Sequence, residues 1–196
     1  MHKALMLCGL LLLAGCTKTI PLQKEYSGPV PLTVSGDKIR LDLTMRKNDG
    51  TAYESNVIAV VQYRTIAENA LKKAGYSLDS TAETVIGVTL TAASDKTIFW
   101  LDTHAGENLA TGMLTLGAAC HDSTANVAAK GHVVMRKDGA TVVDRDIDMN
   151  DSQDDCFGGV SGRPMDQRAV WPLRVYEAAV NKHIASWLQL ALNAGR

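Results

Sequence analysis

The chain has 196 residues and a formal net charge of −1; 46% of its residues are hydrophobic and only 5% are aromatic. This near-neutral charge gives no electrostatic reason to bind nucleic acid, so we expect no nucleic-acid partner. The length fits a single domain, and the scarcity of aromatic residues predicts an aliphatic core.

A secretory leader is predicted at residues 1–15. Lys3 provides a basic start, and residues 4–14 are almost wholly apolar. This apolar run is too short for a stable membrane-spanning helix, which needs about 20 residues. A basic start, a short apolar run and small residues at its end are typical of a cleaved signal peptide.

The leader ends in Leu13-Ala14-Gly15-Cys16, which resembles the lipobox of bacterial lipoproteins. The resemblance implies cleavage before Cys16, diacylglycerol on its sulfur and, usually, a third acyl chain on the new amino terminus. Two or three acyl chains anchor a protein stably to a membrane. In Gram-negative lipoproteins an aspartate after the cysteine favours inner-membrane retention, so Thr17 implies the outer membrane, with the protein facing the periplasm. The alternative is an ordinary secretory signal in which the cysteine falls by chance.

Residues 16–32 are interpreted as the lipidated amino terminus and a tether, because Pro21, Pro29 and Pro31 favour an extended chain. The alternative is that part of this segment packs on the domain as an irregular strand. Residues 33–196 are expected to form one domain.

Two cysteines remain for the mature domain once Cys8 leaves with the leader and Cys16 is lipidated. In an oxidising compartment Cys120 and Cys156 are expected to form a disulfide. A metal-binding pair is the alternative, but it would need about two further ligands at suitable spacing.

Periodicity predicts the secondary structure of the domain. Residues 38–46 alternate as a strand, and residues 57–74 follow helical spacing up to Gly75, a natural left-handed cap. Asp138-Gly139 between alternating runs predicts a tight hairpin. Further strands are expected at residues 84–92, 127–136 and 141–149, and a final helix from Pro172 with an apolar stripe of Leu173, Tyr176, Val180, Ile184, Trp187 and Ala191.

These elements predict an α+β fold: a two-layer sandwich with a mainly antiparallel sheet of about four strands and two helices on one face. The architecture resembles small outer-membrane accessory lipoproteins of envelope assembly. Examples are the lipoprotein partner of lipopolysaccharide assembly and the activators of penicillin-binding proteins. No sequence motif supports either match, so the resemblance is one of fold alone.

The sequence shows no catalytic group, and we expect neither an enzyme nor a cofactor or metal site. Gly159-Val160-Ser161-Gly162-Arg163 lacks the final glycine of a hydrolase elbow. Aspartates cluster between Asp144 and Asp155 and leave calcium open as an alternative. An EF-hand starting at Asp144, however, would place Met149 where the turn glycine belongs.

Two segments are candidate partner-binding surfaces. One is a long insertion over residues 99–116, and the other is a polar loop over residues 151–163. Alternatively, the aromatic residues of the insertion fold back to cover a sheet edge. The candidate contact residues are Phe99, Trp100, Met113, Leu114, Asp154 and Asp155.

The expected function is therefore a membrane-anchored binding or accessory module of an envelope assembly, with a protein partner in the envelope. A periplasmic inhibitor or immunity protein against a cell-wall-targeting toxin is the alternative, with residues 151–155 as an acidic plug. An envelope enzyme is a further, weaker alternative.

Overall fold

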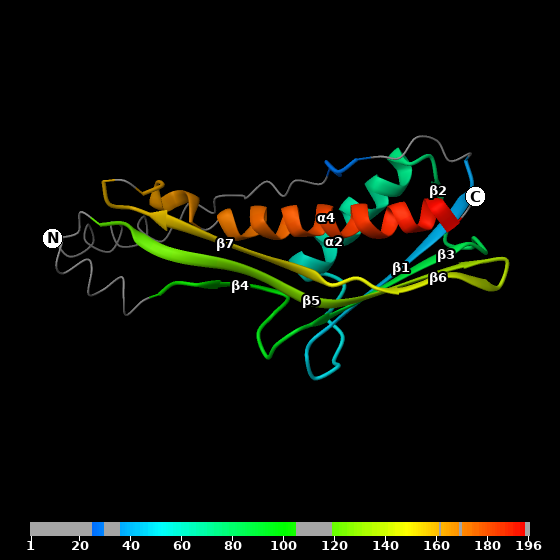
Figure 1. Cartoon of the computed structure of the whole chain (residues 1–196), viewed down its shortest axis with the longest axis horizontal. Coiled ribbons are helices and arrows are strands. Elements are labelled where there is room, and N and C mark those ends of the chain that lie inside the picture. The colour runs from blue at the N-terminus through cyan, green and yellow to red at the C-terminus, as the bar shows by residue number, and fades with distance from the viewer. Residues whose placement is uncertain (1–24, 30–35, 105–118, 161, 169, 195–196) are drawn as a thin grey trace, which may run out of the picture.

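The computed structural model describes residues 25–29, 36–104, 119–160, 162–168 and 170–194. Two helices, α2 (Ile58–Lys73) and α4 (Trp171–Ala194), cover one face of a curled mixed sheet (Figure 1). The described strands are β1 (Lys38–Arg46), β2 (Ser77–Leu78), β3 (Val85–Ala92), β4 (Phe99–Asp102), β5 (His121–Lys137), β6 (Ala140–Asp146) and β7 (Met149–Phe157). A short 3-10 helix, η2 (Met165–Gln167), precedes α4.

The long strand β5 organises the sheet, because each of its edges pairs with two shorter strands in succession. Along one edge β3 pairs with residues 129–136 of β5, and β4 pairs with residues 124–127. Along the other edge β6 pairs with residues 132–137, and β7 pairs with residues 121–129. The order β2-β1-β3 completes the sheet beyond β3.

The α+β class and the two helices on one face are confirmed, but the predicted sheet of about four strands is too small. The described residues form seven strands, and β1 pairs in parallel with both β2 and β3. The parallel pairing follows from α2, which carries the chain back across the sheet after β1. β2 and β4 are too short, at two and four residues, to show a period in the sequence.

Two local signals in the sequence are confirmed. Gly75 ends α2 with φ of 92°, while its N–H donates to the Lys72 carbonyl and that of Tyr76 to the Leu71 carbonyl. These two bonds satisfy carbonyls that the end of the helix leaves free. Asp138 and Gly139 join β5 to β6 with φ of 52° and 78°, the left-handed pair that a two-residue hairpin requires.

The core lies between the helices and the inward face of the sheet. Five of the six residues predicted as the apolar stripe of α4 are buried, and only Leu173 stays half-buried. The facing positions of β5 include the small residues Ala125, Ala129 and Gly131, which let α4 pack close to the strand. A Cβ atom on Gly131 would lie 1.9 Å from the Ile147 carbonyl oxygen.

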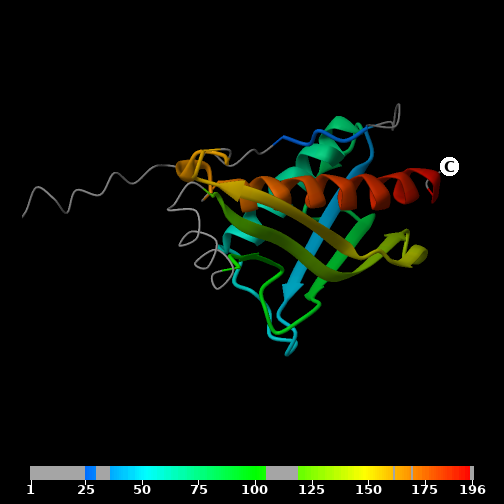
Figure 2. The ribbon, with the colours of Figure 1, turned by 60° about the vertical axis from the view of Figure 1, so that its left-hand side comes forward.

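The segment at residues 25–29 packs on the helices, so part of the predicted tether belongs to the folded body. Tyr26 is 1% exposed, and Lys73 on α2 donates to its carbonyl over 2.6 Å. The Ser27 N–H donates to Asn181 Oδ1 on α4 over 2.9 Å. Figure 2 shows this blue segment lying over the helices, on the side away from the sheet.

Among the described residues, no helix combines the length and the apolar character needed to cross a bilayer.

Candidate functional site

The sheet face opposite the helices carries a polar network where β4, β5 and β7 lie side by side. Trp100 and Ser152 flank Asn126 in register, while Asp102 and Asp154 flank Thr124. Residues directly opposite one another on neighbouring strands project to the same face, so these side chains meet. We call the following group the open-face network: Lys96, Trp100, Asp102, His104, Thr124, Asn126, Ser152 and Asp154.

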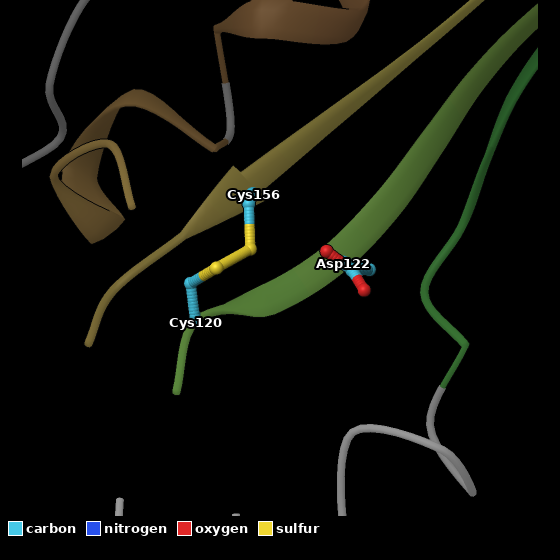
Figure 3. Close-up of side chains that lie close together, drawn as sticks. All are labelled: Cys120, Asp122 and Cys156. Atoms are coloured by element: carbon cyan, nitrogen blue, oxygen red, sulfur yellow. A yellow bond between two sulfur atoms is a disulfide. The ribbon is translucent and has the colours of Figure 1, made fainter. Parts of the chain in front are cut away.

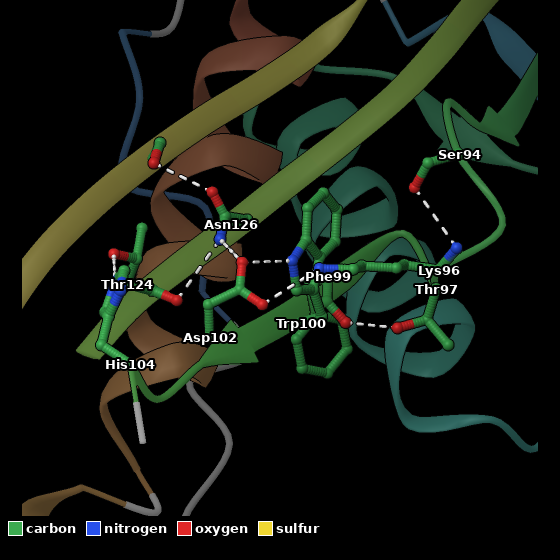
Figure 4. A network of polar contacts seen from close by, with 10 residues as sticks. Ser94, Lys96, Thr97, Phe99, Trp100, Asp102, His104, Thr124 and Asn126 are labelled. Atoms are coloured by element: carbon green, nitrogen blue, oxygen red, sulfur yellow. Dashed lines mark hydrogen bonds and ion pairs between the residues drawn. The ribbon is translucent and has the colours of Figure 1, made fainter. Parts of the chain in front are cut away.

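Asp102 is the centre of this network (Figure 4). Lys96 Nζ lies 3.0 Å from Asp102 Oδ1, and Trp100 Nε1–H donates to Oδ2 over 2.9 Å. Asn126 Nδ2 donates to the same Oδ2 over 3.1 Å. Hydrogen bonds from Lys96 and then Trp100 lower the pKa of the Asp102 carboxyl below its ordinary value, which favours the ionised carboxylate. The Lys96 ammonium also lies 5.1 Å from the centre of the Trp100 ring.

The network continues onto β7 and onto the end of β4. Ser152 Oγ donates to Asn126 Oδ1 over 3.0 Å, and Thr124 Oγ1 donates to Asp154 Oδ1 over 2.7 Å. His104 Nε2 lies 2.8 Å from the same Thr124 oxygen. Because the single Thr124 hydroxyl proton goes to Asp154, His104 must donate through Nε2.

This arrangement presents a rigid, polar contact surface. Its members are half-buried or exposed, and hydrogen bonds between neighbouring strands hold them before any ligand arrives. The Trp100 indole on this face is a side chain of a type enriched in protein interfaces. An open cleft of about 470 Å³ begins beside Lys96, between the segments that follow β1 and β3. It is lined by Lys47, Asn48, Asp49, Tyr53, Asp95, Lys96 and Thr97.

Two backbone donors on the outer edge of β7 are occupied by carboxylates of the same strand. Asp151 accepts from the N–H of Ser152, and Asp155 accepts from the N–H of Cys156, each over 2.9 Å. The Cys156 carbonyl accepts from the N–H of Arg163, which marks this side of the strand as the outer edge. A partner strand would have to displace these carboxylates from the edge donors.

The predicted disulfide is present and joins Cys120, just before β5, to Cys156 on β7, with a Cα–Cα distance of 5.5 Å (Figure 3). Asp122 lies beside it, so that one potential ligand atom from each of the three residues falls within 4.8 Å of the others. Both sulfurs are committed to the S–S bond and offer no thiolate. These three residues therefore fit the predicted disulfide and not the alternative of a metal-binding cysteine pair.

The candidate contact residues separate in the structure. Trp100 and Asp154 belong to the open-face network, whereas Phe99 points to the helices, with its ring 4.9 Å from the Tyr176 ring. Phe99 therefore packs on the folded body, which agrees with the alternative prediction that aromatic residues of the insertion fold back. Asp155 forms an ion pair with Arg163. Met113, Leu114 and Cys16 lie outside the described residues.

The predicted loop over residues 151–163 is wrong in its first half, because residues 151–157 belong to β7. These residues are mostly aspartate, serine and glutamine, which disfavour strands, and pairing with β5 overrides that preference. Sequence reasoning also missed Thr124 and Asn126, because the start of β5 buries small residues such as Ser123 and Ala125. The alternation of these small residues with polar ones was the sequence signal from which the start of β5 could have been predicted.

A second polar chain is buried under the helices. Trp187 Nε1–H donates to the Tyr63 hydroxyl over 3.0 Å, and that hydroxyl lies 2.7 Å from His183 Nδ1. His183 Nε2 lies 2.8 Å from the Ile147 carbonyl, so it must carry the proton, and Nδ1 accepts from Tyr63. Burial lowers the pKa of His183, whose two ring nitrogens both have partners in the core.

Comparison with known proteins yields no family model and no curated protein that matches the chain. Solved structures with a similar course include a DUF330-family protein from Xanthomonas campestris, at 10% identity and a TM-score of 0.48 over 87% of this chain and 95% of that one. Another is rare lipoprotein B from Shewanella oneidensis, at 10% identity and 0.44 over 80% and 99%. A third is a homologue of the neuraminyllactose-binding haemagglutinin from Helicobacter pylori, at 10% identity and 0.41 over 86% and 87%. Likenesses at this level transfer no function to the chain.

Proposed function

We propose that this chain is an envelope lipoprotein, anchored through acyl chains on Cys16 and sorted to the outer membrane, where it faces the periplasm. The observation that carries the proposal is Leu13-Ala14-Gly15-Cys16 at the end of a basic and apolar leader. The protein acts there as a binding or accessory module of an envelope assembly.

The open-face network supports the binding role. Its side chains already hold one another in place. Binding of a partner therefore costs little side-chain conformational entropy on this surface. The carboxylates bound to the N–H groups of Ser152 and Cys156 disfavour strand addition at these positions of β7. The partner is expected to contact Trp100, Asp102 and Asn126.

The inhibitor alternative loses its supporting observation. It relied on an acidic loop at residues 151–155 that could enter an active site, but these residues form part of β7. Two of their carboxylates bind backbone N–H groups of the same strand.

The anchor is tested by mass spectrometry of the amino-terminal peptide and by membrane fractionation. Cys16→Ser should release the protein from membranes, whereas Cys8→Ser, a cysteine of the leader, should leave fractionation unchanged. An unmodified Cys16 in the wild-type protein would refute the anchor.

The binding role is tested by complementation of a deletion strain, with resistance to detergents and large antibiotics as the readout. Trp100→Ala should fail to complement at normal protein levels, because it removes the indole and one donor to Asp102. Thr89→Ala is the matched control, since Thr89 lies on the same face in β3 but outside the network. Full complementation by Trp100→Ala, or hydrolysis of cell-wall sacculi by the purified protein, would overturn the role.

A further inference from the structure

The folded body receives the chain on the outer surface of its helices. The segment at residues 25–29 lies over α2 and α4 in both views (Figures 1 and 2). Its contacts with Lys73 and Asn181 and the burial of Tyr26 hold it there. The chain that follows Cys16 therefore joins the folded body on the side of the helices and not on the side of the sheet.

The distance between the anchor and this surface is short. Glu25 follows Cys16 by nine residues, and a fully extended chain spans at most about 3.3–3.6 Å per residue, so the connection reaches no more than about 30 Å. Helix α4 alone, with 24 residues, is about 36 Å long. A body held this closely brings its helical surface to the membrane more readily than its opposite face.

Charge favours the same orientation. The two helices carry five cations against Glu68 and Glu177, a net charge of +3. The sheet face opposite the helices carries aspartates and basic residues in similar numbers, among them Asp144, Asp146 and Asp154 against Arg40, Lys130 and Arg136. An anionic lipid surface attracts a basic residue close to it by about 1 kcal/mol and repels carboxylates. The helix cations are Arg64, Lys72, Lys73, Arg174 and Lys182.

The exposed stripe of α2 also carries apolar side chains suited to an interface. Ile58 and Val61 are 41% and 38% exposed, and they lie at helical spacing from Thr65, Glu68 and Lys72. A stripe with apolar residues at one end and lysine at the other is suited to lie on lipid headgroups.

We propose that the outer surface of α2 and α4 docks on an anionic phospholipid surface, so that the open-face network points away from the membrane. This inference rests on the proposed anchor at Cys16. It adds that the body has one preferred orientation, in which Trp100 and Asp102 are presented to partners in the aqueous space.

The test uses the full lipidated protein, with Cys16 acylation verified by mass spectrometry, in vesicles of phosphatidylcholine mixed with phosphatidylglycerol. A fluorescent amino acid replaces Glu68 on α2 in one variant and Thr89 on the open face in another, and headgroup-attached quenchers report proximity to lipid. Strong quenching is expected at position 68 and weak quenching at position 89. The difference should shrink in vesicles of phosphatidylcholine alone.

Charge reversal supplies the matched control. Lys72→Glu with Lys182→Glu should abolish most of the difference between the two positions, whereas Lys130→Glu with Arg136→Glu, on the open face, should preserve it. Lys73 is left intact because it holds Tyr26. An acylated protein with equal quenching at both positions would overturn the orientation alone. An unmodified Cys16 would overturn the anchor and the orientation together.

Discussion

Removal of one oxygen atom, in Tyr63→Phe, should destabilise the protein far more than the loss of a single hydrogen bond. The Tyr63 hydroxyl serves two buried partners, Trp187 Nε1–H and His183 Nδ1. Each is left without a partner in the core, at a cost of about 1–3 kcal/mol per group. The expected loss in the free energy of unfolding is therefore about 2–6 kcal/mol. Tyr176→Phe is the matched control, because that buried hydroxyl serves only the Ala59 carbonyl, and its loss should cost about 1 kcal/mol.

The assay is urea unfolding of the soluble domain with the disulfide intact, followed by tryptophan fluorescence and circular dichroism. A lower midpoint with an unchanged slope would show that stability changed while the surface exposed on unfolding did not. Equal losses in Tyr63→Phe and Tyr176→Phe would refute the reasoning, because they would show that Trp187 and His183 find other partners or need none.

Three further predictions concern the same fold. Gly131→Ala should destabilise by about 3 kcal/mol or more, because its Cβ would lie 1.9 Å from the Ile147 oxygen and 2.9 Å from His183 Nε2. Gly87→Ala, whose Cβ meets nothing closer than 3.7 Å, is the control and should be nearly neutral in urea unfolding. The pKa of His183 lies below its ordinary 6.5 in the folded protein, so the unfolded chain binds the proton more tightly. Its stabilising contribution should be complete above about pH 6.5 and be lost as the pH falls toward the folded pKa; His183→Gln should flatten this part of the stability profile, and an unchanged profile would contradict the assignment. Cys120→Ser with Cys156→Ser should lower the free energy of unfolding by about 3–4 kcal/mol for a closed loop of 36 residues, and reduced wild-type protein should match it; a variant as stable as the oxidised wild type would exclude this role.

The elements with strong local signals could be predicted from the sequence. The helix expected at residues 57–74 matches α2, because helical spacing runs up to Gly75 and basic residues occupy its last turn. The Asp138-Gly139 hairpin follows from positive φ at two adjacent residues, a requirement that few sequences meet.

The remaining strands depend on contacts far away in sequence. β7 is polar along most of its length and becomes a strand because β5 supplies a partner and Cys156 is bonded to Cys120. Sequence reasoning identified Trp100 and Asp154 separately but could not bring them together. Their proximity depends on Asn126 and Thr124, which lie between them on β5.

The carboxylate-capped edge of β7 has a consequence if the chain is anchored as proposed. Anchored molecules diffuse in two dimensions and meet at a high effective concentration, where an open strand edge would template lateral stacking of neighbouring copies. Asp151 and Asp155 occupy two of the donors on this edge, and a strand of a neighbouring copy would have to displace them. Crowded copies can thus stay separate while their open faces remain available.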